Sequence, residues 1–307
     1  MSAYPLVSVG VPVRNGAGTL ARALDSIVRQ TYTNLEVIIS DNQSTDGTEA
    51  VCREYAARDS RIRYMRQRAP LGIIDNFRVP VDASRGDFFL WAAHDDVRDD
   101  DYVETLLRGF ARHPEASLCF GDMAEFSVPM SWEAAEPVQH TFQTLGLSFV
   151  DFVRQQTQTA CAHIYGVIRT EHLRQYRWYE VDEGWDVAAL FWLAMRGPFV
   201  AERGTTLYYF RPPAGRSTSE RAVDNNFRPL SPWWREQLAW ACASAAVEAS
   251  AASGRPLSCV WAFTIVYWHI LQGFKGLLCR VAPRPLLTVY RRVTRRRNPA
   301  AEPRRTA

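Results

Sequence analysis

The first 120 residues alternate between short apolar runs rich in β-branched residues and segments with helical periodicity. The expected strands are residues 6–13, 35–40, 62–65, 88–91 and 116–120, and the expected helices are residues 20–28, 49–58 and 102–112. Thr19 is placed to cap the first helix. Strands joined by helices of this length need crossover connections. The pattern therefore predicts an α/β fold in which helices flank both faces of a mostly parallel, Rossmann-like sheet.

The second half of the chain is less regular. We expect a buried helix over residues 186–196, a strand over 207–210 and helical stretches near 149–156 and over 231–253. This suggests a catalytic domain of residues 1–225, a helical C-terminal extension of residues 226–290 and a basic tail of residues 291–307.

Charge is distributed unevenly along the chain. Residues 275–307 contain ten Lys or Arg and one acid, a local net charge of +9, so residues 1–274 carry −6 of the total of +3. An acidic body argues against a nucleic-acid partner. The absence of a G-x-G-x-x-G motif after the first strand argues against a dinucleotide oxidoreductase. The six cysteines form no C-x-x-C pair, and we expect neither disulfides nor a zinc site.

Two adjacent carboxylates follow the fourth expected strand, in the sequence His94-Asp95-Asp96. Such a pair is repulsive unless a positive charge lies beside it. A hard cation such as Mg²⁺ or Mn²⁺ supplies that charge and takes its other ligands from substrate phosphates. The alternative is a capping pair before the next helix.

A second polar pair, Asp41-Asn42, follows the second expected strand. A carboxylate and an amide can bind a base edge or ribose hydroxyls. The alternative is a turn that these side chains stabilise locally. In parallel sheets ligands bind at the carboxyl ends of the strands, where both pairs are expected.

The order of these segments resembles that of an inverting family 2 glycosyltransferase with the GT-A fold. The segments are VSVGVPVRNG, LEVIISDNQSTDGT, GIIDNF and GDFFLWAAHDD, and the resemblance is close over residues 6–125 and loose over 160–220. It implies transfer of a sugar from a UDP- or dTDP-sugar to a hydroxyl acceptor with inversion, in bacterial cell-surface glycan synthesis. The sequence also permits a non-catalytic sugar-nucleotide-binding protein that uses its basic tail for interactions.

The resemblance also implies roles for individual residues. It places a nucleotide against Pro12, Arg14, Asn15, Asp41, Asn42, Asn76 and Asp95. His94-Asp95-Asp96 stands where the family keeps its Asp-x-Asp motif, with His in place of the first Asp. By this match Asp96 is the direct ligand of Mg²⁺ or Mn²⁺, and Asp95 contacts the ribose or the metal.

Inversion requires a carboxylate that accepts the proton of the attacking hydroxyl. The family's base precedes a buried helix, which here implies Asp186, with Glu183 as the second candidate. Either residue is also explained by the preference for acids at a helix N-terminus. Arg211, Arg216 and Ser217 match a loop that relatives use as a lid over the diphosphate, although a solvated loop has the same composition.

The C-terminal part suggests a membrane surface as a further partner. Residues 257–274 are apolar and aromatic, and an Arg-rich run follows at 291–297. An interfacial helix beside anionic lipids fits this pattern, as do a buried core helix and a span. We expect a cytoplasmic enzyme, peripheral at the inner face of the plasma membrane, with a lipid-linked glycan as a suitable acceptor.

Overall fold

The computed structural model describes residues 4–127, 131–138, 161–179, 184–211, 240–245 and 248. Its strands are β1 (Val7–Val13), β2 (Leu35–Asp41), β3 (Ile62–Arg66), β4 (Phe88–Trp91), β5 (Val97–Arg98), β6 (Leu118–Phe126), β7 (Glu136–Pro137), β8 (Val167–Arg169) and β9 (Phe199–Phe210). Its labelled helices are α1 (Leu20–Val28), α2 (Thr48–Arg58), α3 (Ile73–Ala83), α4 (Tyr102–Arg112), η1 (Trp132–Ala134), η2 (Cys161–Tyr165), α6 (Thr170–Arg174) and α7 (Trp185–Ala194).

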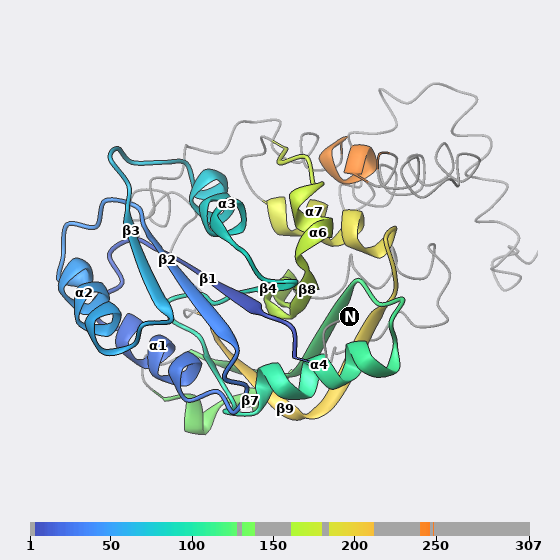
Figure 1. The fold of residues 1–307 in the computed structure, drawn as a ribbon, viewed down its shortest axis with the longest axis horizontal. Coiled ribbons are helices and arrows are strands. Elements are labelled where there is room, and N and C mark those ends of the chain that lie inside the picture. The colour runs from blue at the N-terminus through green and yellow to red at the C-terminus, as the bar shows by residue number, and fades with distance from the viewer. Residues whose placement is uncertain are drawn as a thin grey trace, which may run out of the picture.

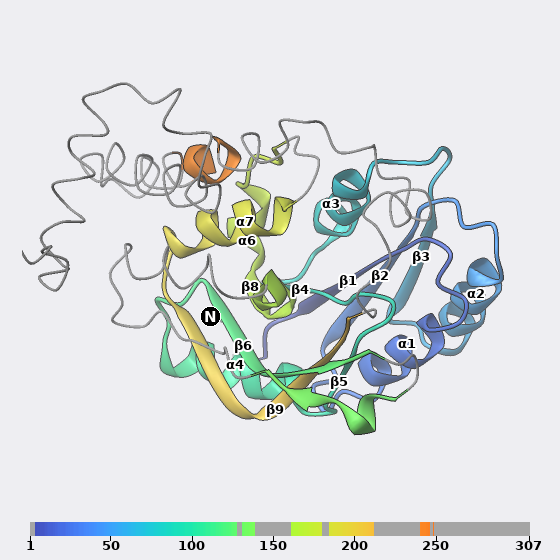
Figure 2. The same ribbon diagram turned by 180° about the vertical axis from the view of Figure 1, so that it is seen from behind.

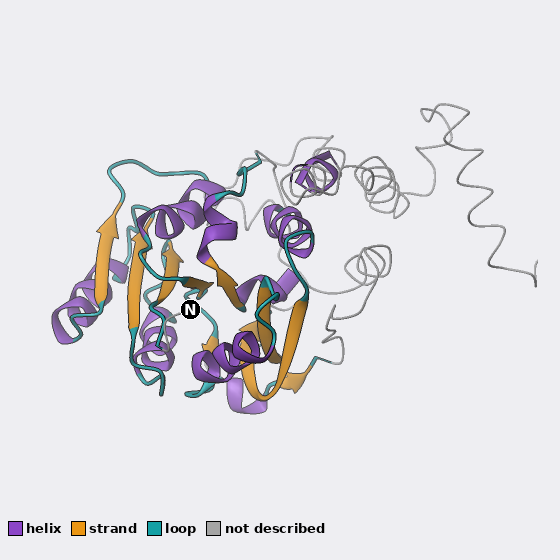
Figure 3. Ribbon diagram, turned by 45° about the vertical axis from the view of Figure 1, so that its right-hand side comes forward, coloured by secondary structure: helices purple, strands orange, loops and turns teal. Residues whose placement is uncertain are grey.

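In the described part of the chain, nine strands form one sheet in the order β3-β2-β1-β4-β8-β6-β9-β5, with β7 paired to β6. Figure 3 shows the strands in orange among the purple helices. The β1–β2, β1–β4, β2–β3 and β6–β9 pairs are parallel. Each antiparallel pair joins only two residues of each strand, so the sheet is mostly parallel, as expected. The three-residue strand β8 connects β4 to β6.

Helices cover both faces of the sheet. Helices α3, α6 and α7 lie on one face, and α1, α2 and α4 lie on the other (Figures 1 and 2). The side chains of β4 alternate accordingly: Phe89 and Trp91 join the hydrophobic cluster that includes α7, whereas Phe88 and Leu90 join the cluster that includes α1. A strand that is apolar on both sides is typical of such a three-layer fold.

Helix α3 packs closely on β1 because the strand has a glycine beneath it. A Cβ atom on Gly10 would lie 2.5 Å from the ring of Phe89 and 2.7 Å from Cβ of Pro80. Helix α3 is not among the helices expected from the sequence, because Pro80 lies inside it and proline disfavours a helix interior.

The structure confirms the six expected strands, although β6 and β9 extend further than expected. Three expectations lie outside the described residues: the helix near 149–156, the apolar stretch 257–274, and both proposed domain boundaries. Within the described ranges, no helix is both long enough and apolar enough to cross a membrane.

Candidate functional site

The sequence motifs meet at one edge of the sheet because the strands that precede them are parallel neighbours. Val13 pairs with Asp41, and Asp41 pairs in turn with Arg66 on β3. Strand β4 ends at Trp91, which pairs with Gly10 on β1. The segments that follow β1, β2 and β4 therefore emerge side by side.

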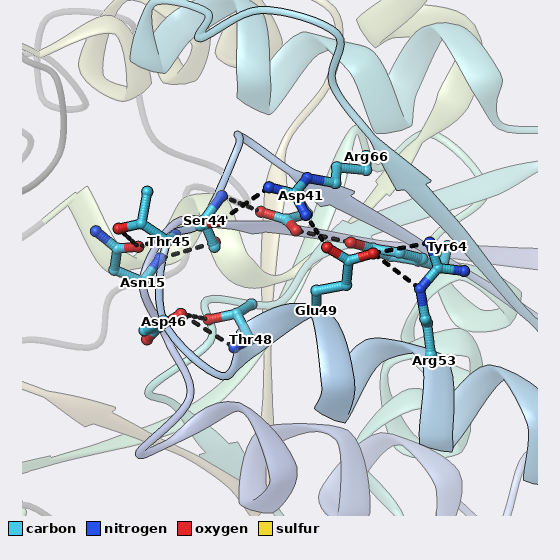
Figure 4. Close-up of polar contacts among 10 residues, drawn as sticks. All are labelled: Asn15, Asp41, Ser44, Thr45, Asp46, Thr48, Glu49, Arg53, Tyr64 and Arg66. Atoms are coloured by element: carbon cyan, nitrogen blue, oxygen red, sulfur yellow. Dashed lines mark hydrogen bonds and ion pairs between the residues drawn. The ribbon is translucent and has the colours of Figure 1, made fainter.

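Asp41 is fully buried, and its carboxylate organises the loop after β2 (Figure 4). Its Oδ1 accepts the N–H of Ser44 at 2.8 Å, and its Oδ2 accepts the hydroxyl of Tyr64 at 2.7 Å. Burial and the hydrogen bond to Asp41 both raise the pKa of Tyr64. Asp41 thus holds its own turn and the adjacent strand, which is the local role that the sequence left open.

Asn42 is also buried and bonded to the protein. Its Nδ2 donates to the carbonyl of Leu71 at 3.0 Å, and its Oδ1 accepts the N–H of Leu71 at 2.6 Å. Both ends of the amide hold the segment that leads into α3. Neither Asp41 nor Asn42 is an open side chain in this structure.

Asn15 joins the loop after β1 to the loop after β2. It has a positive φ of 52°, which asparagine tolerates better than most residues. Its N–H donates to Oγ of Ser44, and its Oδ1 accepts the N–H of Thr45, each at 2.9 Å (Figure 4). Pro12 precedes this link and is buried within β1, opposite Ser40. The two loops therefore form one surface.

Arg14 and Asn76 retain hydrogen-bonding capacity at this surface. The Nε and Nη1 atoms of Arg14 are buried and have no hydrogen-bond partner among the described residues. Asn76 accepts a hydrogen bond from Oγ of Ser40 at 2.7 Å through Oδ1, which leaves no described partner for its amide nitrogen. Unpaired buried donors are costly, so the arrangement fits a ligand rich in acceptor oxygens.

The His94–Asp96 turn packs on the loop after β1. Nδ1 of His94 hydrogen-bonds with the hydroxyl of Thr19 at 3.0 Å. A Cβ atom on Gly16 would lie 3.0 Å from the same nitrogen. Thr19 is the N-cap residue of α1, as expected, but its side chain makes no capping hydrogen bond and contacts the turn instead.

Asp96 is the more buried member of the carboxylate pair, with 3% of its surface exposed. Its Oδ1 accepts the N–H of Phe210 at 3.0 Å, which ties the turn to the end of β9. Burial and the negative charge of Asp95 raise the pKa of Asp96 to about 8, against the opposing effects of the Phe210 N–H, Arg98 and Arg22.

Two arginines supply positive charge near the carboxylates of Asp95 and Asp96, and neither arginine is predicted from the sequence. Arg98 is 2% exposed, and its three guanidinium nitrogens have no hydrogen-bond partner among the described residues. Burial lowers its pKa, whereas Tyr102 and Asp96 raise it. Arg22 on α1 donates to the main-chain carbonyl of Asp95 at 3.4 Å. No local pattern marks these two arginines as buried.

The two carboxylates of this turn are suitable ligands for a hard divalent cation that a substrate also coordinates. Within the described ranges, no three His, Cys, Asp or Glu side chains form a group that could hold a metal by themselves. Mg²⁺ commonly binds through one or two carboxylates together with water and substrate phosphates, and Asp95 and Asp96 offer those two.

Asp186 follows a tryptophan that packs against the end of β4. It lies in the first turn of α7, where its Oδ1 accepts the N–H of Val187 at 2.9 Å. The preceding residue, Trp185, packs its ring 5.4 Å from that of Trp91 at the end of β4 and 4.8 Å from that of Phe77 on α3. Glu183, the second candidate base, lies outside the described residues.

Arg211 is the described residue of the expected diphosphate lid. Its Nη1 donates to both carboxylate oxygens of Glu125, at 3.1 and 3.3 Å. The nearby carboxylate is the main reason why its pKa is raised. Tyr209 also hydrogen-bonds to Glu125. Arg216 and Ser217 are outside the described residues.

A cavity of about 1010 Å³ lies between β5, β6 and β9, and Val97 and Arg98, which follow the carboxylate turn, are among its lining residues. Asp122, Trp132, Arg203 and Tyr208 also line it. None of the site residues expected from the sequence lines it, although Arg98 and Trp132 connect it to the surroundings of the carboxylate turn.

The raised pKa of Asp96 predicts a pH-dependent effect of replacing it. Between about pH 4 and 8 the carboxyl group ionises in the unfolded chain but stays protonated in the fold, so the free energy of unfolding falls as pH rises. Asp96→Asn removes this loss of unfolding free energy with rising pH. In EDTA, the variant should gain stability over the wild type by up to about 1.4 kcal/mol per pH unit in this window. Urea unfolding from pH 4 to 8 measures the difference, and a constant or shrinking difference would contradict the burial argument.

Comparison with known proteins identifies the family. Residues 8–177 match the sequence model described as "Glycosyl transferase family 2". Glycosyltransferase GlyA of Streptococcus pneumoniae is 31% identical over 121 residues, which are 39% of this chain and 17% of that protein. The chain thus spans about a sixth of the length of this relative.

Solved structures share the fold. S. aureus TarS 1–349 in complex with UDP-GlcNAc superposes with a TM-score of 0.65 at 16% identity, covering 90% of this chain and 76% of TarS. The mannosyltransferase PcManGT from Pyrobaculum calidifontis, in complex with GDP-Man and Mn²⁺, gives a TM-score of 0.52 at 16% identity, covering 96% and 81%. The arrangement of the motifs along the sheet edge, the GT-A fold and the match over 8–177 agree: the chain belongs to glycosyl transferase family 2.

Proposed function

We propose that the protein transfers a sugar from a UDP- or dTDP-sugar to a hydroxyl group of an acceptor, with inversion at the anomeric carbon and with Mg²⁺ or Mn²⁺. The observation that carries the proposal is the packing of Trp185 on Trp91. This contact joins the start of α7, which holds Asp186, to the end of β4, the strand that leads into Asp95 and Asp96. The contact supports the proposal that a candidate base and a candidate diphosphate site belong to one active site.

The donor is proposed to lie along the loops after β1 and β2. Arg14 and Asn76 are the side chains best able to bind it, because two buried nitrogens of Arg14 and the amide nitrogen of Asn76 have no partner within the described ranges. The sides of this donor site are proposed to be formed by Asp41, Asn42 and Asn15, because their side chains already hold the loops in place. The complex of TarS with UDP-GlcNAc supports a uracil nucleotide, whereas PcManGT binds GDP-Man.

Each group has one task in the proposed reaction. The acceptor oxygen attacks the anomeric carbon from the face opposite the diphosphate, and its proton passes to the carboxylate of Asp186. The bond between the anomeric carbon and the diphosphate oxygen breaks, and the electron pair leaves with the nucleoside diphosphate. Asp95 and Asp96 are proposed to hold the divalent cation, which offsets the charge developing on the diphosphate. Arg211 contributes a further cation if it releases Glu125.

The acceptor is proposed from the sequence of the C-terminal part. A lipid-linked glycan at the inner face of the plasma membrane would place the Arg-rich run 291–297 beside anionic lipids. These residues lie outside the described ranges, so the sequence pattern alone supports this part of the proposal.

A donor screen tests the proposal. The full-length protein is mixed with UDP-, dTDP- and GDP-sugars in Mn²⁺, and both the shift in melting temperature and the release of nucleoside diphosphate are measured. We expect a uracil or thymine donor to stabilise the protein through binding and to be hydrolysed slowly without an acceptor.

Two outcomes separate the rival functions. Stabilisation without turnover, even with a glycan acceptor, would support a non-catalytic binding protein. Neither binding nor turnover with any donor would contradict both functions.

A further inference from the structure

Arg22 on α1 occupies a position that the proposed reaction does not use. It is buried, with 9% of its surface exposed. Its Nη2 donates to the main-chain carbonyl of Asp95 at 3.4 Å. Its guanidinium carbon lies 4.8 Å from the ring centre of Trp132 and 5.6 Å from that of Phe126. One side chain thus contacts the carboxylate turn and the segment that follows β6.

Charges face Arg22 from two segments: Asp95 and Asp96 on the turn after β4, and Glu133 on η1. Burial lowers the pKa of Arg22, against the opposing effects of these three carboxylates. Stacking on aromatic rings suits a guanidinium, which is planar and weakly hydrated. A lysine could keep the charge but not the combination of stacking and a directed hydrogen bond.

We propose that Arg22 is a positioning residue that orients the Asp95 peptide, and with it the carboxylate pair, by clamping the turn against Trp132. This inference rests on the proposed function, because the turn matters only if it binds a donor. Arg22 acts through Asp95 rather than on the substrate. A displacement of about 1 Å in a site of this kind can cost about 10²-fold in rate, so loss of the clamp should be measurable.

Arg29, at the C-terminal cap of α1, provides a matched control. It follows α1, its side chain is 57% exposed, and it pairs with Asp100 at 3.3 Å. Exposed ion pairs of this kind contribute little to stability. Arg29→Ala therefore removes an arginine from the same region without touching the turn.

The experiment is a double-mutant cycle on the full-length protein with the best donor from the screen. Arg22→Ala, Trp132→Ala, the double variant, Arg22→Lys and Arg29→Ala are compared by kcat/KM, by calorimetric affinity for UDP in Mn²⁺ and by melting temperature. We expect each alanine substitution at the clamp to lower kcat/KM about 10-fold and to weaken UDP binding. The double variant should be no worse than the poorer single variant, because both remove one clamp. Arg22→Lys should recover part of the loss, and Arg29→Ala should behave as wild type.

Each other result overturns the inference. Wild-type kcat/KM in Arg22→Ala would show that the clamp does not position the turn. Losses that multiply in the double variant would show that the two residues act separately. A lower melting temperature with unchanged kcat/KM and UDP affinity would show a purely structural contact. A wild type that neither binds nor turns over any donor contradicts the proposed function itself, which the wild-type measurement reveals before any variant is compared.

Discussion

Asp186→Asn is expected to lower kcat by about 10²- to 10⁴-fold, the usual contribution of a general base, with little change in donor affinity. The substitution should leave the local structure at the start of α7 unchanged. Oδ1 of Asp186 accepts the N–H of Val187, and the amide oxygen of Asn can accept the same bond, so α7 should begin as before. Unlike Asp, Asn cannot accept the proton of the attacking hydroxyl group. Steady-state kinetics of UDP release, with calorimetric UDP binding, separate the two effects.

The companion variants identify the base. Asp186→Ala removes both the proton acceptor and the bond to Val187, and should also cost about 1 kcal/mol of stability. Glu183→Gln should keep full activity. If Glu183→Gln loses kcat and Asp186→Asn does not, Asp186 is only a helix-terminal acid and Glu183 takes its place.

Asp96→Asn is expected to abolish measurable transfer and to weaken Mn²⁺-dependent nucleotide binding. The proposed cation would lose a charged ligand beside the diphosphate, where the transition state gains negative charge. The same variant should be more stable than the wild type at neutral pH, because it removes a buried carboxyl whose pKa is raised to about 8. Loss of activity with a gain in stability would separate a functional role from a folding defect.

Asp100→Asn is the matched control for this result. Asp100 lies four positions along the chain, is exposed and pairs with Arg29 on the surface, so its replacement should change neither activity nor nucleotide binding. Excess EDTA should reproduce the Asp96→Asn defect in the wild type. Full activity of Asp96→Asn, or of the wild type in EDTA, would contradict the proposal that Asp96 binds a divalent cation needed for transfer.

Much of the fold could be predicted because its strands are apolar on both faces. Strands β1, β2 and β4 are uninterrupted buried runs, and α1 and α4 have a clear apolar stripe. Strand β5 has two residues and β8 three, which is too short for a periodic signal. These strands form only because longer neighbours pair with them.

The candidate site likewise contains residues that the sequence predicts and residues that it does not. Asp41, Asp95 and Asp96 stand out as polar residues directly after apolar runs, so the sequence brings them to one edge. Arg22 lies on a helix where an arginine usually faces solvent, and its burial depends on contacts from Trp132, Phe126 and the turn after β4. The bonding of Asn42 to Leu71 depends likewise on the path of a loop 29 residues further along the chain. Such contacts are tertiary, and local sequence carries no mark of them.

The brevity of β8 has a consequence for any attempt to isolate the donor-binding half. Its pairings with β4 and β6 involve two residue pairs each, yet Val167 and Ile168 extend the apolar packing on both faces of the sheet. A chain cut after β4 would leave Phe88–Trp91 as an open edge strand with large apolar side chains on both sides. Edges of this kind recruit other chains and aggregate. The N-terminal half is therefore a recognisable sequence unit but not a self-sufficient module, and its solubility depends on the strands that follow.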